Sequence, residues 1–359
     1  MIGRSGNGGD LVTKTEFWRF GGTPVPATEV ADIARRLEGQ GWDGLAVGQD
    51  IGILADSYLF LALAAAATTR LKVGTAVSVP LRNTMDVANT IAVLYAVSGG
   101  RSVVSFGRGD GGFAQIGRKP MSVAAFETYV SQVQSYLRQE DVDLDGFPST
   151  MRAVYENDPS LDGAKPPVDI SATGPKMIDL AARHADSVTF AVGANVDRLR
   201  DCIKLARDAR AAAGRDPGSL SIGCHIPAAV ATGGVSLAEA RDIVRGAVLR
   251  HTRFSAFDGQ VLAGVSDQDR EAVLRSFEIT RDHKRNMPKK ADFSVASALP
   301  DDFVDRFAIV GDPQQCADRF REVMSLGVDR ILVLTRVPTT DREEGNAARL
   351  ADTVFSQLA

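Results

Sequence analysis

The chain has 359 residues, enough for one large domain or two small ones, and its 44% hydrophobic and 24% charged content is typical of a globular protein with a large core. The net charge of −4 gives no indication of a nucleic-acid or anionic membrane partner. The three cysteines are far apart and form no CxxC pair, which argues against a disulfide framework or a zinc site and favours a reducing compartment.

We expect the N-terminal residues not to form a signal peptide. Residues 1–10 lack the apolar segment of a signal peptide, so we expect residues 1–15 to be a flexible tail. The longest apolar run, residues 58–67, is too short to span a bilayer. We therefore expect a cytoplasmic protein with no membrane partner.

Predicted strands and helices then alternate along the chain. Short apolar runs predict eight strands, at 16–20, 43–48, 71–77, 102–107, 168–174, 186–192, 220–232 and 329–335. Helical spacing and capping residues predict helices at 26–42, 56–69, 84–100, 122–137, 175–184, 196–213, 236–249 and 346–358. Two stretches exceed this rhythm. We expect 139–167 to be an extended loop and 250–300 to contain helical runs, and we expect such excess length to lie over the mouth of the fold as a lid or partner surface.

The repeated strand–helix unit favours an α/β fold of the (β/α)₈ barrel type, as one domain over residues 16–359 with an insertion near 250–300. The alternative is a doubly wound open sheet. That fold would carry GxGxxG directly after the first strand, where this chain has GGTPVPA.

In a barrel, the chemistry lies at the carboxyl ends of the strands. Those ends read GQD at 48–50, AVSVP at 76–80, FGRGDGG at 106–112, SATGPK at 171–176 and VGAN at 192–195. They contain no Ser-His-Asp set and no metal-ligand spacing. Two glycine-rich turns suit the close approach of a flat or phosphorylated ligand.

These motifs, in their order and spacing, resemble the luciferase-like monooxygenase superfamily. The similarity covers about residues 16–337 and includes SGGR at 98–101, GRGD at 107–110 and ATGPKMIDLAARHAD at 172–186. It is closest to the branch of deazaflavin-dependent methylenetetrahydromethanopterin reductases. The resemblance implies a (β/α)₈ barrel that binds coenzyme F420 or FMN at the strand ends, and a homodimer or higher homo-oligomer.

The resemblance also implies where the cofactor binds. Family members commonly have a non-prolyl cis peptide after the third strand, which by match falls between Ala76 and Val77, with small residues leaving room for the ring. Arg108, in the turn formed by Gly107, Gly109 and Asp110, would hold a phosphate. Thr173 and Gly174 precede a helix N-terminus that suits phosphate as well.

The acid/base position departs from the family pattern. Relatives often have an acidic residue, frequently Asp-His, after the second strand, whereas this chain has Gln49–Asp50. Either Gln49 replaces the acid or Asp50 serves one residue later. Among the histidines, we expect His184 and His225 to be structural, and take His251 and His283, with Arg253, as the candidates for substrate contact.

The predicted function is therefore oxidoreduction, with a hydride passing between C5 of F420 and a small organic substrate. One alternative is an FMN-dependent monooxygenase. An alternative of another class is a flavin-binding protein without catalytic activity.

Overall fold

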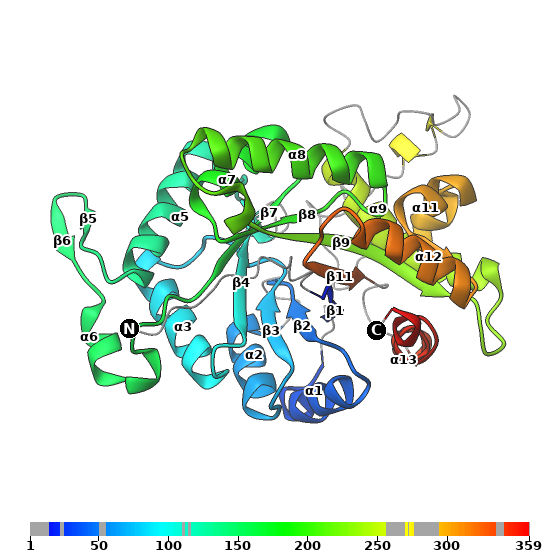
Figure 1. Ribbon diagram of the computed structural model, residues 1–359, viewed down its shortest axis with the longest axis horizontal. Helices are drawn as coiled ribbons and strands as arrows, with labels where there is room; N and C mark the ends of the chain where they lie inside the picture. The colour runs from blue at the N-terminus through cyan, green and yellow to red at the C-terminus, as the bar shows by residue number, and fades with distance from the viewer. Residues whose placement is uncertain are drawn as a thin grey trace, which may run out of the picture.

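The computed structural model describes residues 14–21, 25–49, 55–109, 112–113, 116–255, 270–271, 273–275, 294–334 and 341–358. Its centre is a closed barrel of parallel strands (Figure 1). The barrel strands are β1 (Glu16–Gly21), β2 (Gly44–Val47), β3 (Lys72–Thr75), β4 (Ser102–Phe106), β7 (Val168–Ala172), β8 (Ser187–Phe190), β9 (Ser221–Val230) and β11 (Arg330–Leu334). Because β9 pairs with both β8 and β11, and β11 pairs with β1, the sheet closes. The predicted (β/α)₈ barrel is confirmed.

Helices surround this barrel in the predicted alternation, except that the helix before β11 lies at 313–324, where none was predicted. They are α1 (Val30–Gly39), α2 (Ser57–Ala66), α3 (Thr84–Val97), α5 (Val123–Leu137), α7 (Pro175–His184), α8 (Val196–Ala212), α12 (Pro313–Met324) and α13 (Asp341–Thr353). Side chains of Asp56, Asn83 and Ser122 cap α2, α3 and α5 by accepting from first-turn N–H groups. The main core lies between these helices and the outward faces of the strands, with Leu61, Val104 and Phe320 fully buried in it.

An aromatic side chain fills part of the barrel interior. The indole of Trp18 lies between the backbones of β2 and β3, where a Cβ at Gly44 would be 2.3 Å from Trp18 Cδ2 and one at Gly74 would be 2.9 Å from Trp18 Cζ3. The space at Gly74 is therefore taken by Trp18 and by the Val103 carbonyl, not left open for a ring, which corrects that part of the expectation.

A buried ion pair occupies another part of the interior. Arg330 Nη2 on β11 donates to Asp169 Oδ1 on β7 at 2.9 Å, and both side chains are almost fully buried. Ser187 Oγ and Thr189 Oγ1 donate to the same carboxylate oxygen at 2.6 and 2.9 Å. Several hydrogen bonds thus compensate the desolvation of the pair.

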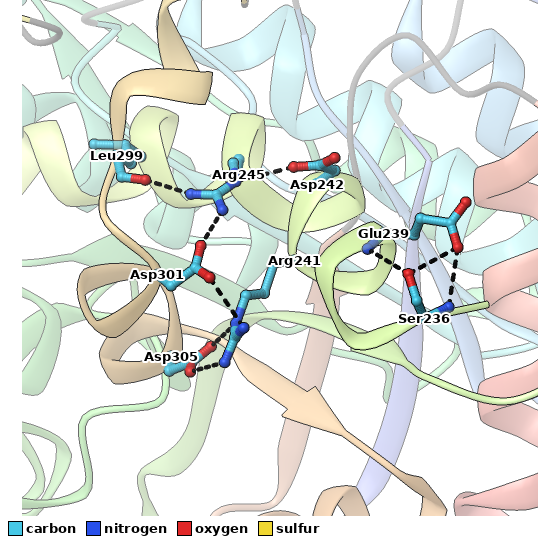
Figure 2. Close-up of polar contacts among 8 residues, drawn as sticks. All are labelled: Ser236, Glu239, Arg241, Asp242, Arg245, Leu299, Asp301 and Asp305. Atoms are coloured by element: carbon cyan, nitrogen blue, oxygen red, sulfur yellow. Dashed lines mark hydrogen bonds and ion pairs between the residues drawn. The ribbon is translucent and has the colours of Figure 1, made fainter.

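The segment after β9 forms a second, smaller hydrophobic cluster. β9 continues past β11 and pairs with β10 (Ile309–Gly311), and α9 (Leu237–Ser255) packs on this extension together with η6 (Ser294–Ala298) and α11 (Asp301–Phe307). Ion pairs join α9 to α11: Arg241 binds Asp305 at 2.7 Å and Asp301 at 3.0 Å, and Arg245 also binds Asp301 (Figure 2). The described ends of the predicted insertion are therefore packed structure.

The same picture shows how α9 begins. The Ser236 hydroxyl accepts from the Glu239 N–H at 3.3 Å, while the Glu239 carboxylate accepts from the Ser236 N–H at 3.0 Å (Figure 2). This reciprocal pair is a capping box. It sets the start of the helix that crosses the barrel mouth, as described below.

The other long segment, 139–167, is not the extended loop that we expected. It contains a hairpin, β5 (Val142–Leu144) with β6 (Phe147–Ser149), and then α6 (Arg152–Asn157) (Figure 1). Asp145 and Gly146 both have positive φ, as a type I′ turn requires. Since the segment connects α5 to the start of β7, it lies at the amino end of the barrel. The expectation that it covers the mouth was wrong.

Cys202, Cys224 and Cys316 are buried and free, in agreement with the sequence-based expectation of no disulfide framework. No helix within the described residues has the length and apolar character needed to cross a bilayer.

Candidate cofactor and substrate site

The carboxyl ends of β2, β3 and β4 lie side by side, because these strands are neighbours in the barrel. The peptide bond between Ala76 and Val77, directly after β3, is cis, as predicted. Both residues are half-buried. The chain then rejoins the sheet, since the Ser78 N–H donates to the Ser105 carbonyl at 2.7 Å and the Gly107 N–H donates to the Ser78 carbonyl at 3.0 Å.

The side chain of Gln49 is bound to this same segment. Its Oε1 accepts from the Val79 N–H at 2.8 Å and from Ser78 Oγ at 3.0 Å, and its backbone N–H donates to the Val77 carbonyl at 3.1 Å. The hydroxyl of Tyr58, from α2, lies 2.8 Å from Ser78 Oγ, and burial raises the pKa of this phenol. Gln49 therefore holds the segment after the cis bond through its amide oxygen.

The glycine turn after β4 packs closely against the end of β3. A Cβ at Gly107 would be 2.8 Å from Val77 Cγ2, so only glycine fits beside the Val77 side chain without a shift. Gly109 has φ +96 and lies under the Phe113 ring, where a Cβ would be 2.5 Å from Cδ2. Close packing thus requires glycine at both positions, and the positive φ of Gly109 favours glycine there as well.

Arg108 is half-buried in this turn. Its Nη1 donates to the Met121 carbonyl at 3.1 Å, and the Met121 N–H donates back to the Arg108 carbonyl at 3.0 Å. One corner of the guanidinium is therefore used to fold the loop between β4 and α5. The guanidinium has five N–H donors, so further donors remain for an anion.

Thr173 and Gly174 lie between β7 and α7, next to the end of β4. Gly174 is the N-cap of α7, makes no side-chain cap, and has no atom within 4 Å of the place where a Cβ would be. Open space thus faces the first turn of a ten-residue helix, whose N–H groups suit an anion. Gly174 thus leaves room for the predicted phosphate contact, which stays a prediction for both residues.

Three of the predicted site residues, Asp50, Asp110 and His283, lie outside the described residues. The backbone of Arg253 is part of α9, but its side chain is outside the description. The structure thus describes Gln49, Ala76, Val77, Gly107, Arg108, Gly109, Thr173, Gly174 and His251, and all except His251 follow the barrel strands β2, β3, β4 and β7.

His251 lies on α9 and stacks on His225 of β9, with ring centroids 5.3 Å apart and ring planes at 27°. His225 is 3% exposed, and its Nδ1 has no hydrogen-bond partner in the described part of the chain. The expectation that His225 is a structural histidine with its hydrogen bonds satisfied does not hold for this nitrogen. Burial lowers the pKa of His225 to about 4, so the ring is neutral at neutral pH.

The sequence analysis missed Tyr58, Ser78 and Val79. Ser78 and Val79 bind Gln49, and Tyr58 binds Ser78, so these contacts bring together the chain after β2, the start of α2 and the segment after the cis bond. The signal that could have found them was AVSVP at 76–80, read as a polar residue beside a predicted cis bond, together with a Tyr in the first turn of an otherwise apolar helix.

Comparison with known proteins agrees with this geometry. A family model described as luciferase-like monooxygenase matches residues 9–330. The 5,10-methylenetetrahydromethanopterin reductase of Methanolobus tindarius is 26% identical over 324 residues, which cover 86% of this chain and 90% of the reductase.

Solved structures share the fold at lower identity. The coenzyme F420-dependent tetrahydromethanopterin reductase of Methanopyrus kandleri has a TM-score of 0.73 at 18% identity, with 96% of this chain and all of the reductase covered. An F420-dependent secondary alcohol dehydrogenase in complex with an F420-acetone adduct has a TM-score of 0.67 at 17% identity, with 96% and 99% covered.

Proposed function

Because this chain belongs to the luciferase-like monooxygenase family, we propose that it is an F420-dependent oxidoreductase that transfers a hydride to or from a small organic substrate. The observation that carries the proposal is the joined carboxyl end of β2, β3 and β4, where Gln49 holds the chain after Val77 and Gly107 packs against it. The matched reductase and the two F420-dependent structures support F420 as the cofactor.

In this proposal, Ala76 and Val77 support the deazaflavin ring, and Arg108, Thr173 and Gly174 hold its phosphate. The protein contributes binding, orientation and hydrogen bonds, while the cofactor supplies the redox chemistry when bound. Gly107 and Gly109 shape the turn that presents Arg108, and Asp110, which lies outside the described residues, stays a proposed cofactor contact. The acid/base role falls to Asp50, because the Gln49 oxygen is already used by Ser78 and Val79.

Titration of the purified protein with F420 and with FMN, followed by fluorescence quenching, tests the cofactor. We expect F420 to bind more tightly. Tighter binding of FMN would favour the second candidate, an FMN-dependent monooxygenase, which the description of the family supports. Failure of both to bind would exclude the third candidate too, a flavin-binding protein without activity.

Single-turnover reduction of the loaded protein tests the acid/base residue. Asp50→Asn should slow the reaction strongly, whereas Gln49→Ala should weaken cofactor binding more than it slows the chemical step. A normal rate in Asp50→Asn, with a large loss of rate in Gln49→Ala at saturating cofactor, would move the role to Gln49.

We also propose a cytoplasmic homo-oligomer. Neighbouring helices expose apolar side chains: Leu59 is 69% and Leu63 46% exposed on α2, and Val93 is 48% and Val97 45% exposed on α3. An apolar outer face of this kind is typical of a subunit interface. Leu59→Glu should shift the mass measured by light scattering to that of a monomer, while an unchanged mass would place the interface elsewhere.

A further inference from the structure

α9 covers part of the barrel mouth. Ala247 on this helix packs with Phe20 of β1 and Leu334 of β11, and Ala76 packs against the same cluster. His251 is one turn further along α9, on the same face of the helix. The ion pairs of Arg241 and Arg245 with α11 hold the helix in this place.

The imidazole ring of His225, on which His251 stacks, lies in the barrel interior. On β9, side chains alternate between the two faces, so His225 points to the same side as Gly223, where a Cβ would be 2.6 Å from Thr189 Oγ1 and 3.4 Å from Arg330 Nη2. The buried charges of Asp169 and Arg330 are close enough to act on His225 electrostatically. His225 therefore lies between this buried ion pair and the mouth.

Strand order places His225 across the barrel from the segment at Val77. The closed order is β1, β2, β3, β4, β7, β8, β9, β11 and back to β1, so β3 and β9 are separated by four steps in either direction. A flat group supported on one face by Ala76 and Val77 would turn its other face toward β9 and α9.

One polar atom of His225 makes no hydrogen bond that supports the fold. Its Nδ1 is buried and lacks a partner among the described residues, and a buried polar atom left in that state costs about 1–3 kcal/mol. An apolar ring of similar size would keep the stacking contact with His251 and avoid that cost. An unsatisfied buried polar group in a folded protein calls for an explanation, and a role in catalysis or ligand binding is one such explanation.

We propose that His225, held in place by His251, hydrogen-bonds a carbonyl or hydroxyl oxygen of the substrate on the wall of the barrel opposite Val77. This inference rests on the proposed function, because it assigns a substrate class to the same site. The ring has no charge to offer, and Arg330 is paired with Asp169, so the site fits an uncharged ketone or secondary alcohol.

Acetone and 2-propanol serve as probes for the full-length protein, with and without bound cofactor. The readout is the imidazole ¹⁵N signals of the labelled protein, which do not depend on turnover. We expect a saturable shift of the His225 nitrogens. In His225→Phe, monitored through His251, probe binding should be about tenfold weaker, the equivalent of one hydrogen bond, while cofactor affinity changes less than about twofold. His225→Gln, which keeps an N–H donor, should restore part of the binding.

Stability separates this role from a structural one. His225→Phe should unfold at a higher urea concentration than the natural chain, since it removes an unpartnered buried polar group. His184→Gln is the control, because His184 contacts Ser131 and Glu127 at the end of α7 and should leave probe binding unchanged.

Three results would overturn the inference: undiminished probe binding in His225→Phe, marked destabilisation of that variant, or no response of His225 to either probe in protein that binds its cofactor. Protein that binds neither F420 nor FMN refutes the proposed function instead. The titration without cofactor then still reports on His225.

Discussion

The Gln49 side-chain oxygen accepts the Val79 backbone N–H at 2.8 Å, so the residue that the sequence resemblance matches to an acidic position binds the neighbouring strand end. Val79 is buried. An amide and a carboxylate can both accept this bond, but only the carboxylate can exchange a proton near neutral pH. An amide at position 49 thus makes the structural contact and offers no titratable group.

Gln49→Leu should lower the free energy of unfolding by about 1–3 kcal/mol, since it leaves the buried Val79 N–H without a partner. Gln49→Glu, which keeps the acceptor, should cost less. Urea denaturation measures both. The control is Gln314→Leu on α12, where the exposed amide binds Asp318 and the change should stay within about 0.5 kcal/mol. Equal losses in Gln49→Leu and Gln314→Leu would contradict the assigned contact.

Gly44→Ala should destabilise the barrel by roughly 1–3 kcal/mol or more, because the new Cβ would lie 2.3 Å from the Trp18 indole, inside the packed interior. Gly39→Ala is the matched control. Gly39 ends α1 with no atom within 4 Å of the added Cβ, so this change should be neutral or stabilise by up to about 1 kcal/mol. The midpoint of thermal or urea unfolding should fall for Gly44→Ala and should stay the same or rise for Gly39→Ala.

Arg108→Ala should weaken cofactor binding by about 1.5–3 kcal/mol, the usual value of a hydrogen bond to a charged group. Circular dichroism should show an intact fold, since the lost contact to the Met121 carbonyl is a single hydrogen bond. Arg118→Ala, at an exposed position of the same loop, should leave affinity unchanged. If both variants bind cofactor like the natural chain, the phosphate lies elsewhere.

The pH dependence of stability should reflect His225. Its pKa is lowered to about 4 from an ordinary value near 6.5, so between these values the unfolded chain binds a proton that the folded chain excludes. This residue therefore lowers stability as pH falls from about 6.5 to about 4, by at most about 1.4 kcal/mol per pH unit. Nearby Asp169 opposes the shift and Arg330 favours it.

Urea unfolding between pH 7 and pH 5 tests this, with His225→Phe as the comparison because other groups titrate equally in both proteins. The natural chain should lose more stability than the variant over this range. Parallel curves for the two proteins would mean that His225 is as easily protonated in the folded state as in the unfolded state.

Much of the fold is determined locally. The strand runs and helical spacing predicted each of the eight barrel strands and most of the helices around them, though not α12. Apolar periodicity, N-cap residues such as Asp56 and Ser122, and C-terminal glycines act within a few residues of chain. The cis bond at Ala76–Val77 and the family were predicted from the order of the sequence motifs, because that order resembles a known family. The hairpin at 142–149 was also locally encoded by Asp145–Gly146, and we overlooked it.

Contacts between distant segments decided the rest. Which residue fills the space at Gly74 depends on Trp18, 56 residues earlier, and the ion pair of Asp169 with Arg330 spans a sequence separation of 161. Composition and residue spacing do not predict such contacts between distant segments. The same holds for His225: its sequence context is an apolar strand, and only the closed barrel places it opposite Val77, beneath His251, with a nitrogen that the described protein leaves without a partner.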